Sequence, residues 1–208
     1  MAQDNNFSGM DMPPQLKKVG NNIQYIILVA LVVVVAFSSF FTVNPEEVGV
    51  VTRFGEFTRT AYPGLNFKAP FIEEVRYVPV ERQLKHEFGY RTTSSGVRST
   101  YQKQGYSDES LMLTGDLNLA DVEWVVQYRV DDPYDFLFKI RNPEQTLRDI
   151  SESAMRQIVG DRTVNEVLTV GRAEVAMKAQ DLIQRICDEY ESGIQIEQIV
   201  LQDINPPD

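Results

Sequence analysis

The single cysteine and the single histidine of the chain, Cys187 and His86, are the residues that could form a nucleophile and its base. A histidine within hydrogen-bond reach of a thiol can take its proton and leave a reactive thiolate, and the sequence leaves that proximity open. Cys187, however, comes four positions after Ile183 at the edge of an apolar helical stripe, and His86 alternates with the apolar Leu84 and Phe88. The pattern favours a buried structural thiol and a partly buried strand histidine.

Other patterns that would indicate catalysis or metal binding are missing from the sequence. It has no serine-nucleophile motif, no P-loop and no dinucleotide-binding glycine motif. Its acidic pairs are adjacent, so in a strand the two carboxylates of each pair point to opposite faces and cannot share a proton. Ligand spacing for zinc or calcium is also missing. We therefore expect no catalytic residues, no cofactor and no metal. The pairs are Glu46-Glu47, Glu73-Glu74 and Asp131-Asp132.

The composition excludes further classes of protein. The 208 residues include 20 basic and 30 acidic side chains, for a formal net charge of -10. Nucleic-acid binding requires a basic surface to neutralise phosphates, so a chain this acidic is not expected to bind nucleic acid. One cysteine cannot form an internal disulfide. An apolar fraction of 43% is typical of a globular rather than a disordered protein.

A long uncharged segment near the N-terminus predicts a membrane anchor. No charged residue occurs from Val19 to Pro45, and Ile26 to Val43 reads IILVALVVVVAFSSFFTV. A bilayer core requires roughly 20 mostly apolar helical residues, whereas the apolar region of a cleaved signal peptide has about 7–15. We predict a single uncleaved transmembrane helix within residues 19–45. The side chains expected within the bilayer are Ile26, Leu28, Leu31, Val34, Phe37 and Phe40.

The charges on the two flanks predict the orientation of this anchor. Lys17 and Lys18 precede it, whereas Glu46 and Glu47 follow it. By the positive-inside rule, residues 1–18 form a short cytoplasmic tail and the rest of the chain lies across the membrane.

The first extramembrane block, residues 46–110, is predicted to be rich in strands. Val48, Val50, Thr52 and Phe54 alternate onto one strand face before Gly55 opens a turn. Short strands are expected around 65–68, 75–80 and 83–88. Residues 89–110 are polar without apolar periodicity and are interpreted as an inserted surface loop, either mobile or contacting a partner through its tyrosines.

The second block, residues 111–208, alternates between strand and helix patterns. A short strand at 111–114 precedes a long one in which Val122, Trp124, Val126, Tyr128 and Val130 share a face. Helices and a final strand at 194–201 follow. The order of strands, helices and one strand indicates an α+β fold with a strand-rich first subdomain and an α/β second subdomain.

The helices of this block carry start and stop signals. Asn142 is expected to cap a helix that starts at Pro143, with Gln145 reaching back and Gly160 ending it. Thr163 with Glu166 is a capping box. A long helix from about Val170 is predicted to end at Gly193. Its predicted buried residues are Ala176, Ala179, Leu182, Ile183, Ile186 and Tyr190.

The charge is unevenly distributed along the chain. Residues 1–45 are neutral, residues 46–107 carry nine basic and seven acidic side chains, and residues 108–208 carry nine basic and twenty-one acidic ones. A block at +2 is compatible with anionic lipid headgroups, whereas one at -12 is repelled by them. The second block is therefore expected to stand away from the membrane.

Several strings resemble the SPFH (band 7) family, which includes stomatin, prohibitin, flotillin and HflK/HflC. Residues 46–83 read EEVGVVTRFGEFTRTAYPGLNFKAPFIEEVRYVPVERQ, with GVV-RFG and PGL-F in the family's order after one anchor. The strings LTGDLNLADVEWVVQYRVDDPYDFLF, LRDISESAMRQIVGDRTVNEVLT and GIQIEQIVLQDINPP are similar to the HflK branch rather than to the HflC branch. The resemblance covers residues 46–208.

The resemblance implies a non-catalytic membrane scaffold of the bacterial inner membrane, with its SPFH domain in the periplasm. Its implied partners are membrane lipids, an HflC-like subunit and an FtsH-like AAA protease whose action it modulates. It implies a large hetero-oligomeric cage around a membrane microdomain, built with a long helix that would follow the last residue, Asp208. It also places the first subdomain against the outer leaflet, which suggests Leu65, Phe67 and Phe71 as lipid contacts.

Two other functions stay open at this point. One is a stomatin-like organiser of lipids or channels. The other is a membrane protease subunit with its own activity, which would depend on Cys187 or Ser153.

Overall fold

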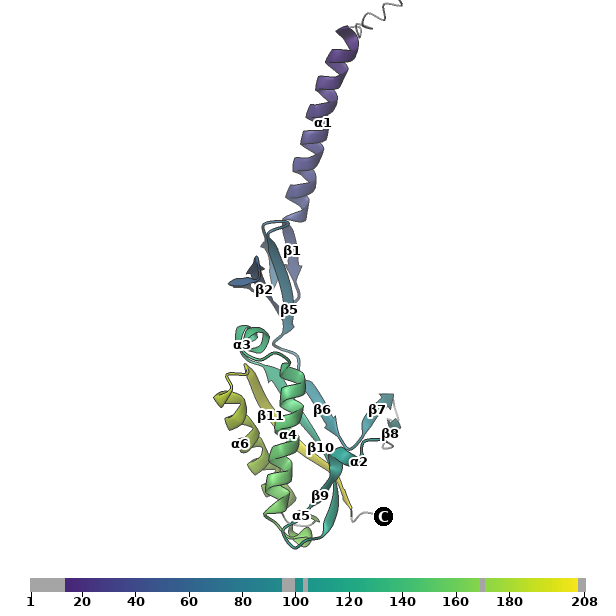
Figure 1. The fold of residues 1–208 in the computed structure, drawn as a ribbon, viewed down its shortest axis with the longest axis vertical. Helices are drawn as coiled ribbons and strands as arrows, with labels where there is room; N and C mark the ends of the chain where they lie inside the picture. Colours follow the sequence, from purple (N-terminus) through teal and green to yellow (C-terminus); the bar gives the residue numbers. More distant parts are fainter. Residues whose placement is uncertain (1–13, 95–99, 103–104, 169–170, 206–208) are drawn as a thin grey trace, which may run out of the picture.

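The computed structural model describes residues 14–94, 100–102, 105–168 and 171–205, with side chains along the first helix from Tyr25 onward. Figure 1 shows three parts in a row: helix α1 (Pro14–Ser38), a small β unit and a larger unit of sheet and helices. We call residues 40–79 the first unit and residues 84–205 the second unit. Within the described residues, no helix combines the length and the hydropathy that crossing a membrane requires.

The predicted anchor is divided between a helix and a strand. Helix α1 ends at Ser38, where the hydroxyl of Ser39 donates to the Val35 carbonyl at 2.8 Å. The following strand β1 (Phe40–Val43) pairs with β4 (Gly64–Phe67), which satisfies its backbone. Phe40 was expected in the helix and lies in this strand instead. Residues 1–13 of the predicted tail lie outside the described residues, and of Lys17 and Lys18 only the backbone is described.

The first unit is built around strand β2 (Glu47–Arg53), which pairs with β3 (Glu56–Ala61) and β5 (Glu73–Pro79). Val48 and Val50 pack into one apolar cluster and Val51 into another on the opposite face. Of the four residues predicted to share one strand face, Val48, Val50 and Thr52 are buried, whereas Phe54 is 85% exposed. The strand ends at Arg53, and Phe54 enters the turn at a φ of 51°.

The second unit is centred on the long strand β10 (Leu119–Val130). It pairs with β11 (Ile194–Asn205) and β6 (Leu84–Phe88), and its beginning pairs with β9 (Leu111–Leu113). Side chains of β10 pack in one apolar cluster with helices α4 (Pro143–Gly160) and α6 (Arg172–Glu189). The predicted alternation is confirmed, since its residues are all buried: Val122, Trp124, Val126, Tyr128 and Val130.

The boundary between the two units lies earlier than predicted. Strand β6 pairs along its length with β10, with Phe88 opposite Trp124. The rings of these two residues stack at 4.4 Å between centroids. Residues 84–88 therefore belong to the second sheet, and the units divide between Pro79 and Leu84 rather than at residue 110.

The predicted surface loop 89–110 contains regular structure. It holds strands β7 (Arg91–Ser94) and β8 (Thr100–Gln102) and the short helix α2 (Ser107–Ser110). Arg91 forms an ion pair with Glu109 at 2.7 Å, and the buried Glu87 accepts bonds from the Thr92 amide and hydroxyl, each at 2.7 Å. Polar contacts rather than an apolar stripe hold this segment, so hydrophobic periodicity could not detect it.

The helix ends agree with the predictions in part. Asn142 occupies the N-cap of α4 without a side-chain cap bond, and Gln145 donates to Asp149 at 2.8 Å instead of reaching back. The capping box before α5 (Val164–Leu168) is confirmed, because Glu166 accepts from the Thr163 amide at 2.9 Å and its own amide donates to the Thr163 hydroxyl.

Helix α6 presents a buried stripe that is shifted from the predicted one. Its fully buried residues are Val175, Ala179, Ile183 and Cys187. Cys187 thus lies in the stripe and not at its edge, whereas Tyr190 is 56% exposed. Tyr190 follows the last residue of the helix, so the helical period no longer places its side chain.

The end of β10 joins the two units. Val130 packs in the apolar cluster of Val48 and Val50. The next residues lead into helix α3 (Pro133–Phe138). Its Tyr134 and Phe138 rings lie 4.8 Å and 6.4 Å, between centroids, from the Phe57 ring of the first unit. This aromatic contact continues the apolar core across the boundary.

Gly193 provides a test of how β10, β11 and α3 meet. It has a φ of +66°, and a Cβ there would lie 2.2 Å from the Asp132 carbonyl oxygen. Because that oxygen is backbone, relief requires moving α3, so we expect Gly193→Ala to lower the free energy of unfolding by at least about 3 kcal/mol. Urea unfolding followed by fluorescence of the only tryptophan, Trp124, measures this change.

Gly105→Ala is the matched control. Gly105 also has a positive φ, +92°, but no atom lies within 4 Å of an added Cβ. Only backbone strain of about 1 kcal/mol is expected. Equal losses for the two variants would show that the Asp132 contact is unimportant.

Candidate functional site

The two residues considered for nucleophilic chemistry are unsuited to it. Cys187 is 1% exposed, and burial raises the pKa of its thiol to about 11, so it stays protonated at neutral pH. Burial, helped by the nearby Arg148 and Arg91, lowers the pKa of His86 to about 4. His86 faces the hydroxyl of Tyr128 at 3.2 Å. Each side chain belongs to the packing of the second unit.

Metal ligands do not converge within the described part of the chain. No group of three or more His, Cys, Asp or Glu side chains there is arranged to hold an ion. The free cysteine lies on α6 in the apolar core.

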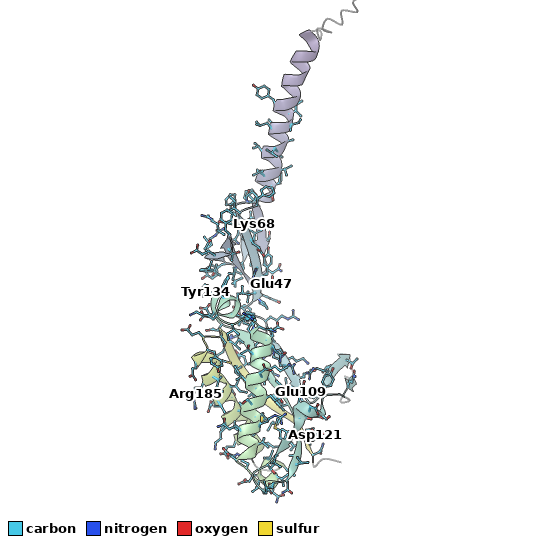
Figure 2. All side chains as sticks on the ribbon, in the orientation of Figure 1. Glu47, Lys68, Glu109, Asp121, Tyr134 and Arg185 are labelled. Atoms are coloured by element: carbon cyan, nitrogen blue, oxygen red, sulfur yellow. The ribbon has the colours of Figure 1, made fainter. Side chains whose placement is uncertain are left out.

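Exposed apolar side chains gather where α1 meets the first unit. Figure 2 shows Lys68 at this junction and Glu47 at the opposite end of the unit. Two turns lie here, one after β2 and one between β4 and β5. We call this surface the apolar tip; its residues, with exposed fractions, are Phe40 55%, Phe54 85%, Leu65 73%, Phe67 60%, Phe71 90% and Ile72 43%.

Backbone contacts bring the parts of the apolar tip together. The Phe54 amide donates to the Ile72 carbonyl at 3.3 Å, which links the two turns. The Lys68 amide donates to the Ser39 carbonyl at 2.7 Å, directly after α1. Phe40 and Phe67 are register partners, and their rings meet edge to face at 6.0 Å. Residues distant in sequence therefore form one surface beside the end of α1.

The two most exposed aromatic residues have strained backbones. Phe54 has a φ of 51° and Phe71 a φ of 66°, in the left-handed region that non-glycine residues avoid. Each such residue costs roughly 1–2 kcal/mol, and such strain persists where surrounding structure holds it and often accompanies function. Both turns point large apolar side chains into solvent, an arrangement that does not stabilise the fold.

The buried carboxylate of Glu73 holds both turns. It pairs with Arg53 at 2.8 Å, just before Phe54, and accepts from the Ala69 amide at 3.0 Å, just before Phe71. Arg59 reaches it at 3.4 Å and also donates to the Phe67 carbonyl. These bonds, the Ala69 amide first and then Arg53, lower the pKa of Glu73 from 4.5 to about 2 although burial opposes them.

The structure places the predicted lipid contacts in different parts of this surface. Phe67 and Phe71 lie at the end that adjoins α1. Leu65 lies two residues farther along β4, opposite Thr42, and the Pro63-Gly64 turn lies farther still. Phe54 and Ile72 were missed: the alternation of β2 placed Phe54 on a strand face with Val48 and Val50 rather than in a turn. A signal was present in the Phe54-Gly55 and Phe71-Ile72 positions, where apolar residues occupy turns.

Replacing Glu73 tests whether it holds the tip. At pH 7 we expect Glu73→Gln to destabilise the protein by about 2 kcal/mol, less than for a fully buried pair because Arg53 and Arg59 are 54% and 40% exposed. A lowered pKa stabilises the fold above pH 4.5, and this contribution is lost as the pH falls towards 2. The difference from wild type should therefore shrink between pH 5 and pH 3 in urea unfolding followed by circular dichroism.

The neighbouring Glu74 is the matched control. Its side chain is 70% exposed and lies 3.6 Å from Arg76. Glu74→Gln should change stability by less than about 0.5 kcal/mol at either pH. A Glu73→Gln variant as stable as Glu74→Gln would show that the buried carboxylate is not what holds the tip.

Comparison with known proteins agrees with this architecture. A model of the SPFH domain / Band 7 family matches residues 41–208. Protein HflK of Treponema pallidum is 41% identical over 86% of this chain and 55% of its own length. Protein HflK of Borreliella burgdorferi is 35% identical over 88% of this chain and 58% of its own length. The Escherichia coli protein named Modulator of FtsH protease HflK is 36% identical over 94% of this chain and 41% of its own length.

These matches extend over both units, and the chain spans between 41% and 58% of the length of these relatives. They confirm the predicted resemblance to HflK proteins and the α+β class. The chain belongs to the SPFH domain / Band 7 family.

Proposed function

We propose that the protein is a membrane-anchored, non-catalytic subunit that modulates an FtsH-like AAA protease together with an HflC-like subunit. The observation that carries the proposal is the similarity to HflK proteins over 86–94% of the chain, one of them named a modulator of FtsH protease. Within the proposal the two subunits alternate in a large cage around a membrane microdomain. The cage and the HflC-like partner come from the family resemblance alone.

The anchor in this proposal combines α1 with the apolar tip. The apolar part of α1 from Tyr25 to Ser38 is about 21 Å long at 1.5 Å per residue, whereas the hydrocarbon core is about 30 Å thick. Most of its large apolar side chains are exposed, from Val33 at 46% to Phe37 at 80%. Insertion of the tip into the outer leaflet supplies the remaining apolar depth. The lipid contacts then include Phe54 and Ile72 beside Leu65, Phe67 and Phe71.

The orientation follows the charge distribution. Lys17 and Lys18 favour a cytoplasmic N-terminus. The first unit, next to α1, carries four basic and five acidic side chains, for -1, whereas the second unit, beyond the first (Figure 1), carries thirteen basic and twenty-one acidic ones, for -8. Repulsion from anionic headgroups favours this arrangement. In a bacterium it corresponds to a single-pass inner-membrane protein with a periplasmic SPFH domain.

A non-catalytic role is supported by the state of the candidate nucleophiles. The Cys187 thiol is buried with a raised pKa, and His86 lies on β6 with its ring against Tyr128 at 5.1 Å between centroids. Ser153 is on the exposed side of α4. Among the described residues, no hydrogen bond joins any two of these three side chains. Modulation through binding requires none of them.

Recovery of partners tests the proposed function. Crosslinking in native membranes followed by affinity purification should recover an FtsH-like protease and an HflC-like subunit. Recovery of a channel protein without the protease would contradict the proposal and indicate a stomatin-like organiser.

Loss of peptide cleavage by the purified protein on Cys187→Ala or Ser153→Ala would contradict the non-catalytic role.

The depth of the tip is tested with environment-sensitive probes in vesicles. A fluorophore on Phe71→Cys should be quenched by lipids with a nitroxide near the headgroup, because Phe71 lies beside α1. The same fluorophore on Leu117→Cys is the control, since Leu117 is 80% exposed at the β9–β10 turn, far from α1. The native Cys187, at 1% exposure, should stay unlabelled. Equal quenching at both positions would rule out an embedded tip.

A further inference from the structure

A hollow of about 390 Å³ lies between the two turns of the apolar tip. Phe54 and Gly55 form one side, and Phe71 and Ile72 form the other. Lys68, Thr52, Glu73 and Glu74 contribute the polar part of its lining. The hollow therefore combines apolar walls with a few polar groups, as small-molecule sites do.

Lys68 is a cation in the lining of this hollow. Neither of the nearby carboxylates, those of Glu73 and Glu74, forms an ion pair with it. The Glu73 carboxylate is engaged by Arg53, by Arg59 and by the Ala69 amide. Glu74 lies 3.6 Å from Arg76. Lys68 is half-buried, and within the described residues its ammonium makes no hydrogen bond or ion pair, although its backbone amide is bonded to Ser39. A half-buried ammonium gains from an anionic partner.

We propose that this hollow binds the phosphate group of a glycerophospholipid in the outer leaflet. The Lys68 ammonium pairs with the phosphate, while the Phe54 and Phe71 rings lie along the glycerol and the first acyl carbons. The inference rests on the membrane orientation proposed above, which puts the hollow at headgroup depth beside the end of α1.

The surroundings favour a lipid over a free phosphate ion. An inorganic phosphate needs several donors around it, and Lys68 and the hydroxyl of Thr52 are the side-chain donors in the described lining. The Thr52 hydroxyl already lies 3.4 Å from the Glu74 carbonyl. The flanking Phe54 and Phe71, 85% and 90% exposed, match the apolar part of a lipid. Both halves of an amphipathic ligand therefore find a complementary wall.

The turns are built before any ligand arrives. The Glu73 network and the bond between the Phe54 amide and the Ile72 carbonyl fix the two sides of the hollow relative to each other. Binding then requires ordering of the Lys68, Phe54 and Phe71 side chains but not of the turn backbone, which limits the entropic penalty. Bound phospholipid would add a directional, headgroup-dependent contact to the general burial of the aromatic rings.

Titration of the full-length protein in detergent with short-chain lipids tests the proposal. The probes are dihexanoyl phosphatidylglycerol, dihexanoylglycerol, which lacks the phosphate, and inorganic phosphate, with binding followed by phosphorus NMR or calorimetry. We expect saturable binding of phosphatidylglycerol alone. Lys68→Gln should weaken it about tenfold, the typical loss of one charge-assisted hydrogen bond. Lys68→Arg should retain it.

Lys178→Gln is the matched control, because Lys178 is a 57% exposed lysine on α6 in the second unit. Its substitution should leave phosphatidylglycerol binding unchanged. Unchanged binding by Lys68→Gln, or no binding by the wild type, would overturn the proposal. Inorganic phosphate binding as tightly as the lipid would replace it with a free-anion site. Because these titrations use the isolated protein, their failure is distinguishable from failure to recover the protease and its partner subunit from membranes.

Discussion

Strand β10 has to fill two cores at once, and the rest of the structure depends on that constraint. Its alternating side chains fill the larger core beneath α4 and α6, while Val130 at its end packs with Val48 and Val50. The Gly193 carbonyl accepts the amides of Asp131 and Asp132 at 2.9 Å and 3.2 Å, so β11 holds this end in place. The carboxylate of Asp132 then caps α3, which packs on the first unit. One strand thus sets how the two units are positioned relative to each other.

The apolar tip depends on a second, smaller constraint, the buried carboxylate of Glu73. Two left-handed phenylalanines together cost roughly 2–4 kcal/mol. Bonds from Arg53 and the Ala69 amide to one carboxylate offset part of that strain and hold both turns. The arrangement exposes the large apolar side chains of Phe54 and Phe71 to water, which is unfavourable. In the proposed orientation a lipid environment removes this conflict, and this supports the tip as the functional surface.

The parts of the fold that could be predicted from the sequence are those governed by regular spacing. The alternation from Val122 to Val130 and the Thr163-Glu166 capping box are local patterns with one structural solution. The earlier boundary at β6 could not be predicted, because it depends on pairing with a strand far along the chain. The 89–110 segment was missed because ion pairs hold it, and Phe54 because the strand period stops one residue before it. Phe67 and Phe71 were suggested by family resemblance. The contacts that hold them could not be predicted, because Arg53, Arg59 and Glu73 are brought together only by the fold.

The division of the apolar run between helix and strand bears directly on the proposed anchor. In sequence, Ile26 to Val43 is continuous, yet in the structure its last part is strand β1, paired with β4. Phe40 and Phe67 therefore lie side by side in the two-stranded sheet of β1 and β4, whose Val43 packs with Val51 of β2. In the proposed orientation, the depth of the protein in the bilayer is then set by the sheet and not by α1 alone. Since Val130 of β10 packs on β2, the second unit lies at a defined distance from the apolar tip and, in the proposed orientation, at a defined height above the membrane, where the proposed protease partner resides.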